Sequence, residues 1–141
     1  MTDQEILDTL NAHQPGFIRM LGGRTVAVDP KAQSITFEFD VSTDFCHSGN
    51  VVQGGFTTAM LDAAMSHAVF AMLGRDNIVN VSSLEIKTSY LAPTLAGKHL
   101  AVGKIVKAAY KTAFLEAQLY NPEGELTATA SSVAKLVRAK Q

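Results

Sequence analysis

The chain has 141 residues, 47% of them hydrophobic, and a formal net charge of -1 at pH 7. That length suits one domain with a hydrophobic core, and the hydrophobic share excludes intrinsic disorder. The balanced charge offers no basic surface, so neither nucleic acid nor an anionic membrane is expected as a partner. A single cysteine excludes an intramolecular disulfide, and polar residues follow Met1 where a signal peptide would be apolar. We expect a cytoplasmic protein with one domain over residues 1–141, including an N-terminal helix (residues 1–13) packed on it.

The segment before residue 47 predicts a short helix followed by two strands. Residues 2–12 begin with Thr2 as a candidate N-cap and carry apolar residues on one face, which is typical of an amphipathic helix. Residues 17–23 are compatible with either a helix or a loop. Residues 24–28 and 34–41 predict strands, and the alternation in ITFEFDV indicates that the second one is antiparallel and half-buried.

The central segment, residues 47–72, reads HSGNVVQGGFTTAMLDAAMSHAVFAM. It opens with turn-forming residues and the pair Gly54-Gly55, and residues 56–72 contain neither Pro nor Gly, so a long helix is expected. Nearly every position in it is apolar, which indicates a helix that is buried on most sides. Its only carboxylate is Asp62. A carboxylate in such surroundings must be paired, protonated or functional, and we interpret this one as functional.

The rest of the chain predicts three or four strands, separated by turns that contain Gly, Pro, Asn or Asp. The strand candidates cover residues 79–91, 100–108, 112–120 and 125–137. Strands gathered around one helix predict an α+β fold in which an antiparallel sheet wraps around the long helix.

This order of elements, with Asp62 eight residues after Gly54, resembles the hotdog-fold acyl-CoA thioesterases. The nearest branch is the phenylacetate-pathway and 4-hydroxybenzoyl-CoA type. The matching pieces are QGGFTTAMLDAAMSHA, SSLEIKTSYLAPTLAG and the closing GELTATASS, and the resemblance covers residues 24–137. It implies the hotdog fold, an antiparallel sheet wrapped around one long central helix.

The resemblance also implies a role for each matching residue. The first glycine of the family's pair, here Gly54, offers its backbone N–H to the thioester oxygen, and the helix carboxylate, here Asp62, acts as nucleophile or general base. A strand Ser or Thr that assists catalysis in some members matches Ser83. His47 occupies the position, Asn or Gln in the family, that lies near the leaving thiolate. The family's His of His-Gly-Gly is Gln53 in this chain, and glutamine cannot titrate.

The residues expected to contact the substrate cluster around the start of the long helix, and they are His47, Gln53, Gly55 and Phe56. The acyl pocket is expected to include Phe56, Met60 and residues near Tyr90. Aromatic and aliphatic acyl groups suit such a lining equally, so the sequence leaves that choice open.

Each candidate has a structural alternative. The Asp62 carboxylate would be structural if Thr58 or Ser66, one helical turn away, capped it. Ser83 would then be an ordinary strand residue, and the glycine pair would serve only for a turn or for tight packing. His47 would be an exposed loop residue, and Gln53 would bond backbone across the turn.

The spacing of Gly54 and Asp62 has a consequence for assembly. Eight helical residues separate the two by about 12 Å along the axis. Both groups must come within about 3 Å of one thioester carbon or of its attacking water. One helix cannot do that, so we expect a homodimer with two interfacial sites, in which Gly54 of one subunit faces Asp62 of the other and Ser83 lies on the Asp62 side. Family members commonly pair such dimers into homotetramers.

The expected function is therefore hydrolysis of a small or medium acyl-CoA, with no cofactor. Since no set of His, Cys, Asp and Glu has the spacing of metal ligands, no metal is expected either. The departures at His47 and Gln53 keep open a catalytically weak or silent acyl-CoA-binding module. His67 follows Asp62 by five residues on a different helix face and suits a satisfied core or interface histidine, whereas His13 and His99 suit the surface.

Overall fold

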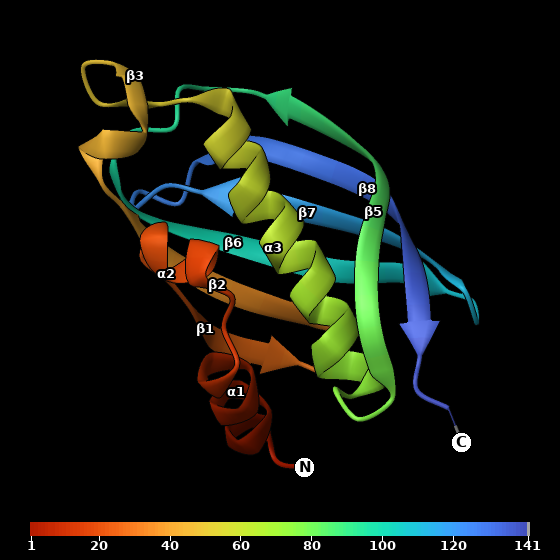
Figure 1. Cartoon of the computed structure of the whole chain (residues 1–141). Coiled ribbons are helices and arrows are strands. Elements are labelled where there is room, and N and C mark those ends of the chain that lie inside the picture. The colour runs from red at the N-terminus through yellow and green to blue at the C-terminus, as the bar shows by residue number, and fades with distance from the viewer. Residues whose placement is uncertain (141) are drawn as a thin grey trace.

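A six-stranded antiparallel sheet wraps around one long helix in the computed structural model (Figure 1). The structure describes residues 1–140, and Gln141, the last residue of the expected domain, lies outside them. Each strand hydrogen-bonds to its neighbours in the order β1-β2-β6-β7-β8-β5. The hotdog fold expected from the sequence is confirmed. The strands are β1 (Gly23–Asp29), β2 (Ser34–Val41), β5 (Ile78–Tyr90), β6 (Gly97–Ala108), β7 (Thr112–Tyr120) and β8 (Leu126–Arg138).

The helices are α1 (Asp3–Ala12), α2 (Gly16–Met20) and α3 (Gly54–Leu73). The ambiguous segment after the first helix is thus the short helix α2, and the long helix begins two residues earlier than expected. A short segment between β2 and α3 was not predicted from the sequence. It comprises the 3-10 turn Thr43–Phe45 and a small hairpin of β3 (Cys46–Ser48) and β4 (Val51–Val52).

One side of α3 packs on the middle of the sheet through apolar contacts. Met60, Leu61 and Met65 are fully buried there. The backbone of α3 also approaches β6 closely, because a Cβ added at Gly103 would lie 2.1 Å from the carbonyl oxygen of Ala64. By length and composition alone α3 could cross a membrane, but half of that apolar window is buried inside the fold, as in the core helix of a globular domain.

The edge strand β5 contains an extra residue that changes which side chains face α3. Ser83 pairs with Ala134 and Glu85 with Val133, so Leu84 is left without a partner in β8 as a β-bulge. Side chains alternate across a strand, and one inserted residue reverses the alternation beyond it. Ser83 before the bulge and Thr88 and Tyr90 after it therefore all face the helix.

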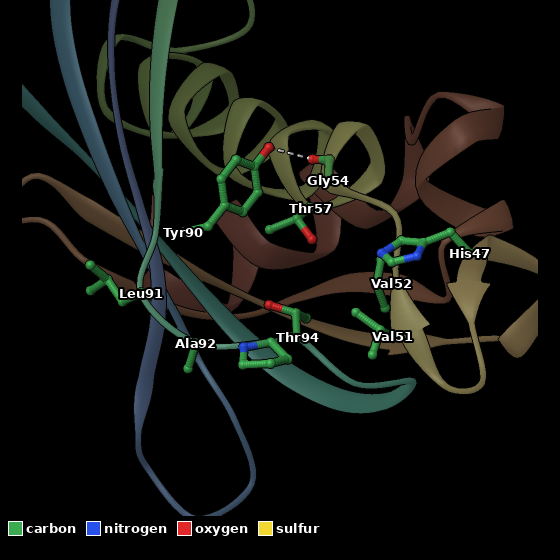
Figure 2. A pocket seen from close by; sticks show the side chains of 10 residues that line it. His47, Val51, Val52, Gly54, Thr57, Tyr90, Leu91, Ala92 and Thr94 are labelled. Carbon is green, nitrogen blue, oxygen red and sulfur yellow. Dashed lines mark hydrogen bonds between the residues drawn. The ribbon is translucent and has the colours of Figure 1, made fainter.

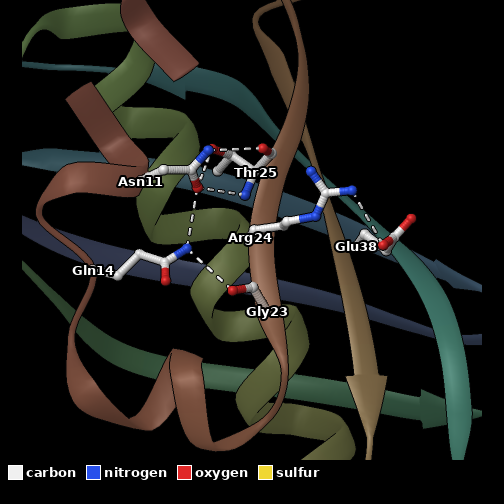
Figure 3. Close-up of polar contacts among 6 residues, drawn as sticks. All are labelled: Asn11, Gln14, Gly23, Arg24, Thr25 and Glu38. Carbon is white, nitrogen blue, oxygen red and sulfur yellow. Dashed lines mark hydrogen bonds and ion pairs between the residues drawn. The ribbon is translucent and has the colours of Figure 1, made fainter. Parts of the chain in front are cut away.

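The N-terminal helix is tied to the first strand by side-chain amides (Figure 3). Asn11 accepts hydrogen bonds from the backbone N–H and the hydroxyl of Thr25, both at 2.9 Å, and donates to the Thr25 carbonyl at 3.0 Å. Gln14 donates to the Asn11 side chain and to the carbonyl of Gly23. These bonds hold α1 and the following turn against the body, as the sequence predicted for the N-terminal helix.

Candidate active site

The first turn of α3 leaves one backbone donor free. Gln53 is the N-cap residue, and its side-chain oxygen accepts from the N–H of Gly55 at 2.7 Å. The N–H groups of Phe56 and Thr57 bond to the Gln53 carbonyl. Among residues 1–140 the N–H of Gly54 has no acceptor, and it lies at the positive end of the helix dipole. Gln53 thus bonds backbone across the turn, and a substrate contact through its amide nitrogen stays a prediction.

A tyrosine on β5 holds this helix start in place. The Tyr90 hydroxyl donates to the Gly54 carbonyl at 2.7 Å and lies 2.9 Å from the hydroxyl of Thr58, which is also 2.9 Å from the hydroxyl of Thr88. A Cβ at Gly54 would meet the Tyr90 oxygen at 3.1 Å, so the glycine allows this close approach. Sequence reasoning missed this arrangement, although Gly54, Thr58 and Asp62 recur every four residues, which places them on one helix face.

Gly54 lines a cavity of about 490 Å³ (Figure 2). Two of the predicted site residues, His47 and Gly54, line it together. Tyr90 also lines it, and its place in the acyl pocket stays a prediction. The remaining walls come from the small hairpin, the second turn of α3 and the loop after β5, namely Val51, Val52, Thr57, Leu91, Ala92, Pro93 and Thr94.

Three other predicted residues lie outside the walls of this cavity. Phe56 packs edge-on against Phe45, with ring centroids 4.8 Å apart, and Gly55 is exposed beside it. Their contacts with substrate stay predictions. Met60 is fully buried in the core because the opposite side of α3 carries it onto the sheet, so its expected place in the acyl pocket is wrong.

The Asp62 carboxylate accepts a hydrogen bond from the Ser83 hydroxyl at 2.7 Å, which is short, as for a charge-assisted bond. The two residues that would have capped it bind elsewhere. Ser66 donates to the backbone carbonyl of Asp62, and Thr58 bonds to β5. The structure thus brings Asp62 and Ser83 together and removes the capping alternative. We call the whole set of facing residues the α3–β5 seam, comprising Gly54, Thr58 and Asp62 on α3 and Ser83, Thr88 and Tyr90 on β5.

A second cavity, of about 310 Å³, lies beside Asp62 and shares no residue with the first. Its walls combine α3 and β5 with the turn that joins α1 to α2. They contain His13, Pro15, Phe17, Asp62, Ala63, Ser66, His67, Phe70, Arg75, Asn80 and Val81. Within the chain, therefore, Gly54 and Asp62 line different cavities.

Two histidines, His67 and His99, are buried in the core. His67 is 5% exposed, lies edge-on to Phe37, and its Nδ1 is 2.8 Å from the Ala63 carbonyl, as expected for a satisfied core histidine. Burial is the main cause that lowers its pKa below the usual 6.5. The hydrogen bond to Ala63 raises the pKa, and the nearby positive charge of Arg75 lowers it further. His99 is 3% exposed, so its predicted surface position is wrong. It lies on the inward face of β6, where its Nε2 is 2.5 Å from the Leu95 carbonyl.

The sequence matches the model of one protein family. The model of the thioesterase superfamily matches residues 49–128, more than half of the chain, and this range contains the α3–β5 seam and most of the residues that line the two cavities. The chain belongs to the thioesterase superfamily. A search of curated proteins finds no match.

Solved structures agree with this family. A Ralstonia eutropha protein, described as a candidate thioesterase related to phenylacetic acid degradation, is 28% identical; the match covers 87% of this chain and 91% of that one, with a TM-score of 0.80. A Haemophilus influenzae thioesterase is 18% identical over 96% and 92% of the two chains, with a TM-score of 0.83. The PaaI protein from the phenylacetic acid degradation operon of E. coli is 14% identical over 96% of both, with a TM-score of 0.80. The last two likenesses establish the fold, and the family supports hydrolysis of thioesters as the class of activity.

Proposed function

We propose that the protein is a cytoplasmic acyl-CoA thioesterase that hydrolyses a small or medium acyl group at sites shared by two subunits. The observation that carries the proposal is the hydrogen bond from Ser83 to Asp62 beside an open cavity. A half-buried carboxylate that accepts one hydroxyl and faces a cavity is available for chemistry, because none of its helix neighbours caps it.

The proposed reaction needs a carboxylate and an oxyanion donor. Asp62 either attacks the acyl carbon or takes a proton from the attacking water, and Ser83 fixes the orientation of its carboxylate. The N–H of Gly54 polarises the thioester carbonyl and stabilises the developing oxyanion. In the net reaction the water oxygen bonds to the acyl carbon, the carbon–sulfur bond breaks, and the sulfur leaves as the CoA thiol with a proton. His47 lies beside Gly54 and serves the leaving thiolate, and Gln53, Gly55 and Phe56 contact the bound thioester.

The distance between these groups supports the proposed homodimer. Gly54 and Asp62 lie about 12 Å apart along α3 and face separate cavities, so one protomer holds two half-sites. β5 hydrogen-bonds to β8 on one edge only, and its Leu84 and Val79 side chains are each 64% exposed. Antiparallel pairing of two β5 edges would cover this strand and place Gly54 of one copy near Asp62 of the other. We propose further that two such dimers form a tetramer.

The first test is release of free thiol from a panel of acyl-CoAs: phenylacetyl, hydroxybenzoyl, and straight chains of four to sixteen carbons. We expect wild type to hydrolyse at least one of them and Asp62→Asn, folded and dimeric, to lose at least about 100-fold in rate. If the variant hydrolyses the substrate as fast as wild type, Asp62 is structural and the proposed mechanism is wrong. If no panel member is hydrolysed, the catalytically weak or silent binding module takes the place of the thioesterase.

A second test concerns the oxyanion donor and the shared site. Gly54 is the first residue of α3 and Gln53 is already extended (φ -62, ψ 137), so the backbone of the helix start accepts proline, which removes the N–H and adds a ring near Tyr90. We expect Gly54→Pro to lose about 100-fold in kcat, the usual cost of one oxyanion donor. Gly54→Ala is the matched control, because it adds a Cβ near Tyr90 and keeps the N–H.

Mixing the two inactive variants tests whether each site uses two subunits. After exchange of subunits, a dimer of one Asp62→Asn chain and one Gly54→Pro chain contains one intact site. Random exchange should therefore restore about a quarter of the wild-type activity. A mixture that stays inactive after the subunits have exchanged would show that the two groups act within one chain, or that one of them does not act at all.

A further inference from the structure

The cavity beside Asp62 has a positively charged group at the end away from the seam. Arg75 lies just after α3, and its guanidinium carbon sits 5.0 Å from the ring centroid of Phe70. Asp62 and Arg75 line the same cavity, and the wall between them is mixed, since Ala63 and Phe70 are apolar and Ser66 is polar. A ligand in this cavity would therefore meet a carboxylate at one end, a partly apolar wall, and a guanidinium at the other.

The Arg75 guanidinium is available to bind a ligand. Among residues 1–140 it makes neither a hydrogen bond nor a salt bridge, and its contact with Phe70 holds the side chain without occupying its five N–H donors. The side chain is exposed, so the charge stays hydrated while the cavity is empty. His13, on the turn between α1 and α2, lines the same cavity and adds a second group that can carry positive charge.

We infer that the acyl group of the substrate carries a terminal carboxylate, which Arg75 binds while the thioester lies at Asp62. This inference rests on the proposed function, since it requires the thioester to be positioned by Asp62. A guanidinium recognises a carboxylate through two parallel N–H donors, and the apolar part of the wall, with Ala63 and Phe70, suits a methylene chain. The substrate class is thus the CoA thioester of a medium-chain dicarboxylic acid.

The spacing sets the chain length. Phe70 follows Asp62 by eight residues, about 12 Å along the helix axis, and a contact at each end takes up to about 3 Å. About 6 to 12 Å remains for the acyl chain. An extended chain advances about 1.2 Å per bond, as the peptide backbone does, so about six to eleven carbons fit. Shorter dicarboxylic acids would not reach Arg75 from Asp62.

The test compares matched substrates that differ only in the terminal group: suberyl-CoA against octanoyl-CoA, and adipyl-CoA against hexanoyl-CoA. Thiol release is measured for wild type, Arg75→Leu and Arg75→Lys. We expect wild type to favour the carboxylated member by about 10-fold in kcat/KM, the scale of one charged contact at an exposed position. Arg75→Leu should remove this preference while changing octanoyl-CoA turnover by less than about 3-fold. Arg75→Lys should retain part of it, because the charge remains.

Arg24→Leu is the matched control, because Arg24 is an exposed arginine paired with Glu38 on β1, outside both cavities. It should leave the preference unchanged. If Arg75→Leu lowers the turnover of both substrates equally, Arg75 contacts the CoA phosphates and the inference is wrong. If octanoyl-CoA is hydrolysed but suberyl-CoA is not preferred, the inference fails while the thioesterase proposal stands. If neither type of thioester is hydrolysed, the proposed function fails first.

Discussion

The two sides of α3 are held by different kinds of contact. One side packs on the sheet, with Leu61 fully buried and Ala64 pressed against Gly103. The other side meets β5 through the hydrogen bonds of the α3–β5 seam. Full burial of a large apolar side chain contributes about 1.5–3 kcal/mol, against about 1 kcal/mol for a net hydrogen bond. The packed side therefore fixes the helix, and the seam can hold reactive groups whose loss does not unfold the protein.

The largest expected effect comes from disturbing the packed side. Gly103→Ala would place a Cβ 2.1 Å from the Ala64 carbonyl oxygen, which belongs to the helix backbone and cannot rotate away. We expect the free energy of unfolding to fall by about 3 kcal/mol and Tm by roughly 10 °C. Thermal unfolding followed by circular dichroism measures this. Gly16→Ala is the control, since its Cβ would have 3.9 Å of room, and equal Tm values for the two variants would contradict the close approach.

On the seam, Ser83→Ala should affect activity far more than stability. It removes the hydrogen bond that orients the Asp62 carboxylate, so kcat should fall about 10-fold while Tm changes by only a few degrees. Steady-state thiol release and a melting curve measure the two effects. Ser83→Thr keeps the hydroxyl and should restore most of the rate. Ser89→Ala, on the opposite face of β5, should match wild type, and an unchanged rate in Ser83→Ala would remove Ser83 from the site.

A smaller effect is expected from Tyr90→Phe at the helix start. The substitution removes the hydroxyl that bonds to Gly54 and Thr58 but keeps the ring. The free energy of unfolding should therefore fall by about 1 kcal/mol. Chemical denaturation measures the change as a shift of the midpoint at constant m. Tyr110→Phe is the matched control because Tyr110 is 68% exposed. A shift in the control as large as that in Tyr90→Phe would argue against the hydroxyl contact.

The smallest effect near neutral pH concerns His67, the titratable group on the packed side. Burial lowers its folded-state pKa below 6.5, so His67 binds a proton more weakly in the folded protein than in the unfolded chain. The contribution of neutral His67 to stability is present above pH 6.5 and is lost as the pH falls through the lower folded-state pKa. Tm measured from pH 8 to pH 5 should fall less in His67→Gln than in wild type. An identical fall in the two proteins would show that His67 does not titrate differently on folding, and His13→Gln, at an exposed position, serves as control.

Local patterns predicted most of the fold. The alternation in ITFEFDV gave β2 with its observed bounds, and the apolar run after Gly54 gave α3 to within two residues. Patterns of this kind report which face of an element is buried, and that information is local. The resemblance placed Ser83 beside Asp62, which no spacing along the chain could have done.

Features that depend on distant contacts were missed. The hydrogen bond from Tyr90 to Gly54 joins residues 36 positions apart, and His99 is buried because β6 pairs with β2, where its partner Phe39 lies 60 positions earlier in the chain. The cavity beside Asp62 likewise needs the turn between α1 and α2 to lie against α3, which a periodicity cannot reveal. The bulge at Leu84 also escaped, since an extra residue in a strand looks like any other residue in the sequence.

Leu84 makes the number of residues in β5 as important as their identity. Because it has no partner in β8, the two segments of the strand on either side of it keep independent registers. Deleting it would leave every other side chain in the sequence and yet turn either Ser83, or Thr88 together with Tyr90, toward solvent. Deletion or insertion of a single codon is thus a route by which this scaffold can exchange the groups that face its helix. For the same reason, an alignment that permits no gap within this strand would equate the wrong positions of related chains.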